Sequence, residues 1–365
     1  MFLDAIPRLT TIVIHQVFPD LASIPKGPAH ERISPASAAG GCTLWLMTQT
    51  APVPMAEATS LREKSWVFFN GEIVRYADAK VGLLTHGLNY GTGVFEGIRG
   101  YWNADREQLF ALCVPQHYER MLQNTRSLQM VIPWTIEELT ETTLDLLRRN
   151  EYREDVYVRP LSFKSAEIIG VKLHDVEDSF AIVTAPMGLY VGNGGIRCMV
   201  SSWRRIDDSM APVRTKCTGL YVNSALAKSE ALQGGFDEAI MLSGDGHVCE
   251  GSAENIFIVR RGEVITPPPS DNILEGITRS LVMHLVREEL GLDVLERTVD
   301  RSELYISDEV FLVGTGAQVA PVIEIDRRRI GDGEPGPLTM RVQDTYSKVV
   351  TGRDPKYAAW LTPVY

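Results

Sequence analysis

The chain has 365 residues and a formal net charge of −11, with 44% apolar and 23% charged residues. This length exceeds what one hydrophobic core usually holds, so two domains are expected. The acidic balance argues against a nucleic-acid partner, because no basic stripe compensates it. No apolar run is long enough to cross a bilayer, which argues against a membrane partner.

Cysteine and histidine usage indicates the compartment and argues against a metal site. The cysteines are Cys42, Cys113, Cys198, Cys217 and Cys249. Their spacing matches neither C-x-x-C nor a set of metal ligands, and their odd number suits a reducing compartment rather than a disulfide framework. We therefore expect a cytoplasmic protein. The dispersed histidines also argue against a metal site.

Residues 1–64 are expected to be a disordered extension. They combine a short apolar piece, Thr11–Ile14, with many Pro, Ala, Gly and Ser residues. They lack the basic start and continuous apolar region of a secretory signal. Met47 or Met55 is an alternative start site, and we expect function not to depend on this segment.

Residues 65–186 are expected to form a small α/β domain. Asn70-Gly71 lies between two apolar runs, which is the strongest short signal for a β-hairpin. Further strands are expected at 94–101, 109–113, 156–163 and 180–184. Helical spacing predicts helices at 116–130 and 136–149, and Thr135 with Glu138 forms a capping-box pattern before the second.

Residues 187–195 are glycine-rich and follow a proline, which predicts an interdomain loop. The remaining residues, 196–365, are expected to form a larger domain. Helices are predicted at 221–232, 277–290 and 338–351, and strands at 198–204, 239–242, 256–259, 264–266, 292–296 and 309–313. Short connections between strands favour α+β sheets and barrels over a doubly wound sheet, and no G-x-G-x-x-G follows a strand.

Lys216 is the candidate nucleophile. It lies in the apolar, small-residue stretch Thr215–Tyr221, which contains no acid. An amine held away from water offers a free lone pair for Schiff-base chemistry with a carbonyl. Tyr221 begins a predicted helix and is either a hydrogen-bond donor to such a carbonyl ligand or half-buried packing.

Glu250 is the candidate carboxylate. We expect it in a turn that precedes a strand, from which it can point inward. A carboxylate beside a pyridine nitrogen keeps that nitrogen protonated. Two alternatives stay open: Glu250 is a solvated turn residue, or Glu254 supplies or supports the carboxylate.

Two glycine-containing turns are candidate phosphate sites. Gly276–Thr278 opens a predicted helix, where free N–H groups favour an anion. Gly314–Gly316 ends an apolar strand and can present consecutive N–H groups. Each is equally compatible with an ordinary helix cap or tight turn. Arg99 follows a glycine-rich strand and either adds positive charge or is simply exposed. Together these features describe a site for pyridoxal phosphate.

Six segments of the chain resemble the fold-type IV, or class IV, pyridoxal-phosphate aminotransferases, most closely the bacterial branched-chain amino acid aminotransferases. The segments are Leu88–Arg99, Tyr157–Leu161, Lys216–Tyr221, Glu250–Phe257, Gly276–Arg279 and Gly314–Ala317. The resemblance runs from about Trp66 to the C-terminus. It implies a small N-terminal α/β domain, a larger β-barrel-like C-terminal domain that binds the cofactor, and a homodimer or higher homo-oligomer.

The resemblance also implies residue roles. Lys216 would form the Schiff base, Tyr221 would meet the ring hydroxyl and Glu250 the pyridine nitrogen. The phosphate would be held by Arg99, Gly276, Ile277, Thr278 and Thr315. The substrate pocket would be formed by Tyr90, Phe95, Gly97, Tyr157, Arg159, Met187 and Tyr190, with Thr315 and Gly316 binding the substrate carboxylate.

Tyr157-Val158-Arg159 resembles the branched-chain enzymes in particular. It implies transfer of the amino group of leucine, isoleucine or valine to 2-oxoglutarate, which gives branched 2-oxo acids and L-glutamate. Leu220, Met187 and Gln318 depart from the family pattern, which commonly has asparagine, tryptophan and glutamate at these positions. Two other functions are therefore kept: a transaminase of D-amino acids or (R)-primary amines, and a non-catalytic binder of phosphorylated small molecules.

Overall fold

The structure is a computed structural model that describes residues 64–188 and 194–365. The expected extension, apart from Lys64, and Tyr190 of the expected interdomain loop lie outside the described residues. The described residues belong to one compact unit, within which the fold is described below. In the described ranges, no helix is long and apolar enough to span a membrane, and no His, Cys, Asp and Glu side chains are grouped as metal ligands.

The first sheet has the strand order β17-β5-β4-β6-β7-β1-β2, with β3 paired to β6. Its strands are β1 Trp66–Phe69, β2 Glu72–Arg75, β3 Gly93–Phe95, β4 Ile98–Asn103, β5 Gln108–Leu112, β6 Val156–Lys164, β7 Asp178–Pro186 and β17 Leu361–Pro363. The predicted hairpin is confirmed, because Trp66 pairs with Arg75 and Phe69 with Glu72. Asn70 and Gly71 both have positive φ, as a two-residue type I′ turn requires.

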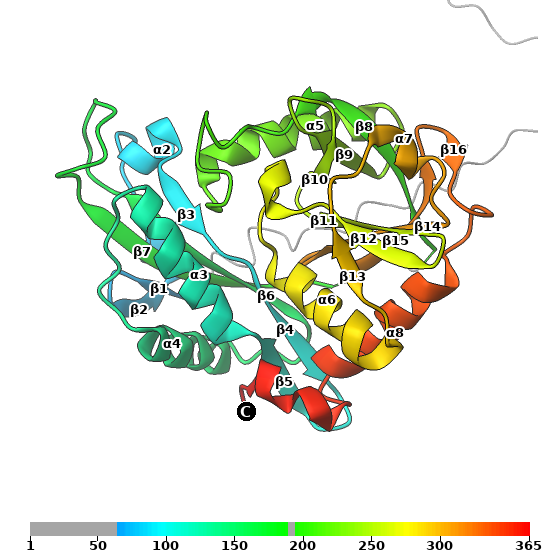
Figure 1. Ribbon diagram of the computed structural model, residues 1–365. Helices are drawn as coiled ribbons and strands as arrows, with labels where there is room; N and C mark the ends of the chain where they lie inside the picture. Colours follow the sequence, from blue (N-terminus) through cyan, green and yellow to red (C-terminus); the bar gives the residue numbers. More distant parts are fainter. Residues whose placement is uncertain (1–63, 189–193) are drawn as a thin grey trace, which may run out of the picture. The chain divides into compact units, whose positions relative to one another are not determined.

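Two long helices cover one face of the first sheet (Figure 1). They are α3 Val114–Ser127 and α4 Ile136–Arg149, and a short helix, α2 His86–Tyr90, precedes β3. The predicted capping box of α4 is confirmed: Thr135 accepts a hydrogen bond from the Glu138 N–H, and the Glu138 carboxylate accepts one from the Thr135 N–H. The inward face of α3 carries Tyr118 and Met121, both fully buried against the sheet.

The second sheet has the order β10-β9-β8-β15-β14-β11-β12-β13, with β16 paired to β15. Its strands are β8 Ile196–Arg204, β9 Glu238–Leu242, β10 Val248–Gly251, β11 Asn255–Arg260, β12 Glu263–Thr266, β13 Val294–Glu296, β14 Glu309–Gly314, β15 Gln318–Ile325 and β16 Arg328–Arg329. Because β10 also pairs with β11, six of these strands close into a ring. Closure satisfies strand edges that would otherwise be exposed. The expected barrel-like second domain is therefore observed.

Helices cover the outside of this ring. Helix α5 Tyr221–Gln233 contacts β8 and β9, whereas α6 Ile277–Leu290 and α8 Pro337–Val350 lie beside β14 (Figure 1). Short helical elements complete the chain: α7 Arg301–Leu304, η1 Tyr76–Asp78, η2 Thr218–Leu220, η3 Pro269–Asp271 and η4 Pro355–Trp360. The predicted helix at 277–290 has the bounds of α6. The predicted helix at 221–232 ends one residue before α5 does, and the one at 338–351 begins and ends one residue after α8 does.

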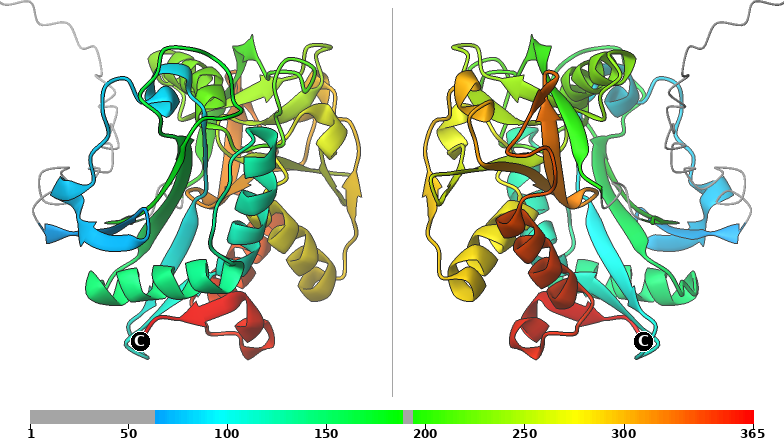
Figure 2. Two further views of the ribbon diagram at one scale, coloured as in Figure 1. Left: turned by 90° about the vertical axis from the view of Figure 1, so that its left-hand side faces the viewer. Right: turned by 90° about the vertical axis from the view of Figure 1, so that its right-hand side faces the viewer.

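The chain passes from the first sheet to the second between β7 and β8, and the fold is the expected two-domain α/β arrangement. One strand departs from this order. The C-terminal strand β17 returns to the first sheet and pairs with β5, Leu361 lying opposite Leu112 (Figure 2). The domain limits at 65–186 and 196–365 therefore stay a prediction, because the last strand belongs by hydrogen bonding to the other sheet.

Candidate active site

A polar pocket lies at the lysine segment, beside the start of α6 and the end of β14. Its lining includes every predicted cofactor-binding residue except Arg99: Lys216, Tyr221, Glu250, Gly276, Ile277, Thr278 and Thr315. Arg120, Arg205 and Asn255, which the sequence did not single out, also line it. Residues far apart in the chain thus meet at one site.

The backbone of Lys216 is held by the first sheet. The Phe95 N–H donates to the Lys216 carbonyl at 3.0 Å, and Cys217 forms an isolated bridge with Val94. Beyond the lysine, the Gly219 N–H donates to the Gly91 carbonyl at 3.0 Å. The segment that carries the lysine is therefore hydrogen-bonded to β3, which fixes where its side chain starts.

The side chain of Lys216 is half-buried. Its Nζ lies 2.7 Å from the Tyr221 hydroxyl and 5.0 Å from the centroid of the Phe95 ring. Among the residues that the structure describes, Lys216 forms no ion pair with a carboxylate. The amine is thus oriented by a hydroxyl and an aromatic ring, which leaves it available to a carbonyl ligand.

Glu250 lies in strand β10, not in the turn that the sequence predicted. The reason is that β10 closes the ring, and Glu250 pairs there with Asn255 of β11. Its Oε1 accepts from Arg205 Nε at 2.9 Å, and its Oε2 accepts from Asn255 Nδ2 at 3.1 Å and from the Leu274 N–H at 3.0 Å. The carboxylate is buried but fully provided with donors.

Two buried glutamates line the pocket and differ in their neighbours. Burial raises the pKa of Glu250, and Arg205 opposes this rise. Burial also raises the pKa of Glu254, and there the nearby carboxylate of Glu238 raises it further. Of the two, Glu250 is therefore the better suited to carry a negative charge and to face a protonated ring nitrogen.

Another part of the pocket lining is suited to an anion. Gly276 is the N-cap of α6, and Ile277 and Thr278 form its first turn, where backbone N–H groups are free of helical partners. A Cβ at Gly276 would lie 2.1 Å from the Asn255 Oδ1, so only glycine fits. Thr315 follows the end of β14 on the same lining, as the sequence predicted.

Arg99 does not agree with its predicted role at the phosphate. It lies within β4, where strand alternation directs its fully buried side chain away from the pocket lining. Its Nη2 donates to the carbonyls of Met187 at 2.6 Å and Gly188 at 2.7 Å, and lies 3.5 Å from Asp155. Arg99 therefore binds the residues that follow β7, and it does not line the pocket.

Arg120 is the arginine that lines the anion side of the pocket. It lies on α3, three residues after the buried His117, so both belong to the inward helix face. This spacing is a sequence signal for Arg120, but it becomes informative only once α3 is known to pack beside the pocket. Arg205, directly after β8, carried no comparable signal.

Four of the predicted substrate residues lie together. Arg159 Nη2 donates to the Tyr157 hydroxyl at 2.9 Å, and the Arg159 guanidinium lies 4.5 Å above the Phe95 ring. A Cβ at Gly97 would lie 2.2 Å from the Tyr157 hydroxyl, so Tyr157 occupies space that only glycine leaves free. Through Phe95, this aromatic and charged group lies next to Lys216.

Of the other predicted substrate residues, Thr315 lines the pocket with Lys216, whereas Tyr90, Met187 and Gly316 lie elsewhere. Tyr90 is partly exposed, and its hydroxyl accepts a hydrogen bond from the Gly170 N–H at 3.1 Å. Met187 lies beside Arg99, and Gly316 follows Thr315 without lining the pocket. Tyr190 lies outside the described residues. Among the described residues, the structure thus gathers the Tyr157 group but does not bring Tyr90, Met187 or Gly316 to it.

The donors and acceptors of the pocket fit pyridoxal phosphate. An amine (Lys216) suits its aldehyde, a buried carboxylate (Glu250) its ring nitrogen and a hydroxyl (Tyr221) its phenolic oxygen. A helix N-terminus and the Arg120 guanidinium suit its phosphate. Each polar group of that cofactor has a matching partner in this one pocket.

Comparison with known proteins agrees with this reading. The family described as amino-transferase class IV matches residues 93–325. A probable branched-chain-amino-acid aminotransferase of Aquifex aeolicus is 51% identical over 301 residues, which are 82% of this chain and 97% of that protein.

Solved structures are similar over the same part of the chain. The branched-chain aminotransferase of Thermoproteus uzoniensis, crystallised with norvaline, is 45% identical at a TM-score of 0.79 and covers 82% of this chain and 99% of its own. The enzyme of Thermobaculum terrenum, in its pyridoxal-phosphate form, is 39% identical at a TM-score of 0.80 and covers 83% and 99%. The family match, the relatives and the pocket agree: the chain belongs to the class IV aminotransferases.

Proposed function

We propose that the chain is a pyridoxal-phosphate-dependent transaminase of branched-chain L-amino acids, with 2-oxoglutarate as the amino acceptor. Leucine, isoleucine and valine would give branched 2-oxo acids, and 2-oxoglutarate would give L-glutamate. The observation that carries the proposal is the Lys216 amine, 2.7 Å from the Tyr221 hydroxyl, in a pocket that also contains Glu250 and the start of α6.

The chain's own residues provide the cofactor's contacts. Lys216 would bind the aldehyde, Glu250 the ring nitrogen, Tyr221 the phenolic oxygen, and Arg120, Thr278 and Thr315 the phosphate. Bound pyridoxal phosphate supplies an electron sink for the carbanion that forms when an amino acid loses its Cα proton. Arg120 replaces Arg99 in this assignment, because Arg120 lines the pocket and Arg99 does not.

Lys216 is the proposed base and acid of the reaction. Once the substrate amine has taken its place, the free Nζ accepts the Cα proton and later returns a proton. The Tyr221 hydroxyl orients Nζ for both transfers. The Phe95 ring and Tyr157 provide apolar surface for a branched side chain, and Arg159 offers a positive charge to a carboxylate.

Replacement of Lys216 tests the assignment. The purified protein should absorb visible light, and borohydride should bleach it and attach the cofactor to the peptide that contains Lys216. Lys216→Ala should lose essentially all turnover of L-leucine, whereas Lys172→Ala, at an exposed lysine, should keep it. Near-wild-type turnover in Lys216→Ala, or borohydride attachment at another lysine, would refute the proposal.

A substrate panel tests the preferred amino donor. We expect L-leucine to be turned over faster than D-alanine and (R)-phenylethylamine. Phe95, beside Lys216, and Tyr157 offer apolar surface to a branched side chain, which D-alanine lacks, and Arg159 offers a positive charge to a carboxylate, which (R)-phenylethylamine lacks. The reverse order would identify a D-amino acid or amine transaminase. A colourless protein that ignores added pyridoxal phosphate would instead indicate a non-catalytic phosphate binder.

We further propose that the chain forms a homodimer or higher homo-oligomer. Two segments joined by the Thr85–Glu167 bridge and by the Tyr90–Gly170 hydrogen bond carry exposed apolar side chains, including Leu83 (85% exposed) and Ile169 (86% exposed). Such a patch suits contact with a second copy. Sedimentation analysis should show a dimer or larger species, and a monomer at micromolar concentration would contradict this proposal.

We also propose a cytoplasmic location. Cys113, Cys198, Cys217 and Cys249 are free thiols, and all four are buried. Free thiols suit a reducing compartment. Cell fractionation with an antibody to the chain would test the location, and recovery in an extracellular fraction would contradict it.

A further inference from the structure

Arg120 reaches the pocket with its guanidinium already fixed by a buried carboxylate. Its Nε donates to Glu96 Oε1 and its Nη2 to Glu96 Oε2, both at 2.7 Å. Glu96, which follows β3, has no exposed surface. This two-point pairing sets the plane of the guanidinium as well as its position.

His117 binds the same carboxylate. Its Nδ1 lies 2.7 Å from Glu96 Oε2. Burial alone would raise the pKa of Glu96, but Arg120 and His117 outweigh burial and hold its pKa well below its usual range. An ionised carboxylate only accepts hydrogen bonds, so Nδ1 of His117 is the donor.

Arg120 has a third fixed contact, at the start of α6. Its Nη1 donates to the carbonyl of Glu275 at 2.8 Å, and Glu275 directly precedes the helix N-cap Gly276. One N–H remains on each terminal nitrogen of the guanidinium. A guanidinium held in this way is preorganised, because little side-chain freedom is left to lose when an anion binds.

We infer that Glu96 and His117 are positioning residues for the cofactor phosphate, which act by holding Arg120 in the orientation that the phosphate requires. The inference rests on the proposed function, since it takes the phosphate of pyridoxal phosphate as the ligand. A buried ion pair is a weak source of stability, because desolvation offsets most of its attraction. A carboxylate, an imidazole and a guanidinium buried together beside an anion site are better explained by orientation of the guanidinium.

Two cofactor forms separate phosphate positioning from general damage. Pyridoxal phosphate and pyridoxal share the ring and aldehyde, and only the first carries a phosphate. Dissociation constants of both for the apo-protein can be measured by titration of visible absorbance. Glu96→Gln should raise the dissociation constant of pyridoxal phosphate about tenfold or more, which is about 1.4 kcal/mol. The constant for pyridoxal should change about twofold at most, because its contacts with Lys216 and Glu250 are unchanged.

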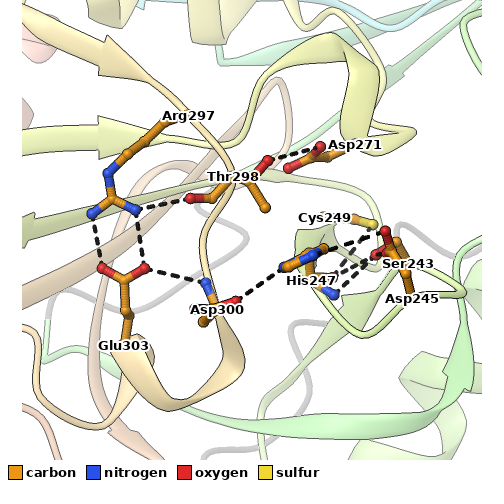
Figure 3. A network of polar contacts seen from close by, with 9 residues as sticks. All are labelled: Ser243, Asp245, His247, Cys249, Asp271, Arg297, Thr298, Asp300 and Glu303. Atoms are coloured by element: carbon orange, nitrogen blue, oxygen red, sulfur yellow. Dashed lines mark hydrogen bonds and ion pairs between the residues drawn. The ribbon is translucent and has the colours of Figure 1, made fainter.

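A matched control removes a similar pair elsewhere. Glu303 accepts hydrogen bonds from Arg297 Nη1 at 3.0 Å and Nη2 at 2.8 Å, and Figure 3 shows this fork next to Asp300. Neither residue lines the pocket. Glu303→Gln should leave the ratio of the two dissociation constants unchanged. If it changes that ratio as Glu96→Gln does, the effect is general and the inference is wrong.

A double-mutant cycle shows whether Glu96 acts through Arg120. Arg120→Gln should abolish most of the preference for pyridoxal phosphate over pyridoxal. Adding Glu96→Gln to it should then change the preference no further. If the two changes are additive, Glu96 does not act through Arg120, and the inference fails.

A smaller change covers the case in which Glu96→Gln does not fold. His117→Gln keeps the fork between Glu96 and Arg120 and should weaken pyridoxal phosphate several-fold while sparing pyridoxal. Equal weakening of both ligands, or of neither, would overturn the inference. The proposed function fails separately: it fails if the wild-type protein binds no pyridoxal phosphate at Lys216.

Discussion

Gly91 lies against Gly219 where the lysine segment joins the first sheet. Gly91 ends α2 with φ of 67°, in the left-handed region, and its carbonyl accepts from the Gly219 N–H at 3.0 Å and from Thr218 Oγ1 at 2.8 Å. A Cβ at Gly91 would lie 2.6 Å from the Gly219 Cα. Carbon atoms in contact prefer roughly 3.5–4.0 Å, so Gly91→Ala must separate the two backbones by about 1 Å.

Two costs of Gly91→Ala add. An L-residue in the left-handed region costs about 1–2 kcal/mol. Overpacking against a backbone atom costs about 1–3 kcal/mol more. We therefore expect the free energy of unfolding to fall by about 2–5 kcal/mol. Because the shift moves the segment that carries Lys216, kcat should fall by about tenfold to a hundredfold.

Gly291 provides the control. It ends α6 with the same φ of 67° and a ψ of 28°, against 21° at Gly91. A Cβ there would meet nothing within 4 Å. Gly291→Ala should therefore lower the free energy of unfolding only by the cost of placing an L-residue in the left-handed region, and it should keep kcat. Urea unfolding measures both free energies. If the two variants lose equal stability and both keep kcat, the close contact is compliant and the reasoning is wrong.

Three further changes have expected outcomes. Gly97→Ala would place a Cβ 2.2 Å from the Tyr157 hydroxyl. We therefore expect kcat/KM for L-leucine to fall about tenfold while the affinity for pyridoxal phosphate is kept. An unchanged kcat/KM would exclude Tyr157 from the wall of the substrate pocket. Hydrogen bonds, first from Arg297, lower the pKa of Glu303 from 4.5 to about 2. The stability that Glu303 provides is therefore present above pH 4.5 and is lost as pH falls towards 2. Over that interval, the free energy of unfolding should fall less steeply in Glu303→Gln than in the wild type. Parallel curves of unfolding free energy against pH would contradict the ion pair. The buried Glu309 carboxylate caps α8 by accepting hydrogen bonds from its first N–H groups. Glu309→Gln should lower the free energy of unfolding by about 1–2 kcal/mol, measured by thermal or urea unfolding, and leave turnover unchanged. Lost turnover would instead link α8 to the pocket.

Local patterns explain why so many elements could be predicted. The Asn70-Gly71 turn, the Thr135–Glu138 capping box and the apolar spacing of α6 each depend on a few neighbouring residues. Lys216 could be singled out for a similar reason, since its short segment lacks an acid. Such signals do not require knowledge of what the element packs against.

Features that depend on pairing between distant strands were missed or misplaced. Strand β10 is only four residues long, and it is a strand because both β9 and β11 bond to it, so Glu250 was predicted in a turn. The C-terminal β17 was not predicted, because its partner β5 lies far away in the chain. Short strands take their identity from their neighbours more than from their own residues.

The arginines show the same division within the site. Arg99 stands in a glycine-rich motif beside Phe95 and Gly97, which made it the natural sequence candidate for the phosphate. The register of β4 instead directs it to the carbonyls of Met187 and Gly188. Arg120 belongs to a helix that, read alone, is an ordinary amphipathic one. It becomes a ligand candidate because α3 packs where Glu96 and the start of α6 can hold its guanidinium.

By itself, the sequence determined the chemical groups of the site: an amine, a carboxylate, a tyrosine and two glycine turns, together with most of the helices that carry them. These depend on side-chain chemistry and on contacts within a few residues. Tertiary structure alone decided which arginine faces the anion, that Glu250 stands in a closed ring of strands, and that the lysine segment is bonded to β3. Such choices depend on hydrogen bonds and packing between segments that the chain order keeps far apart.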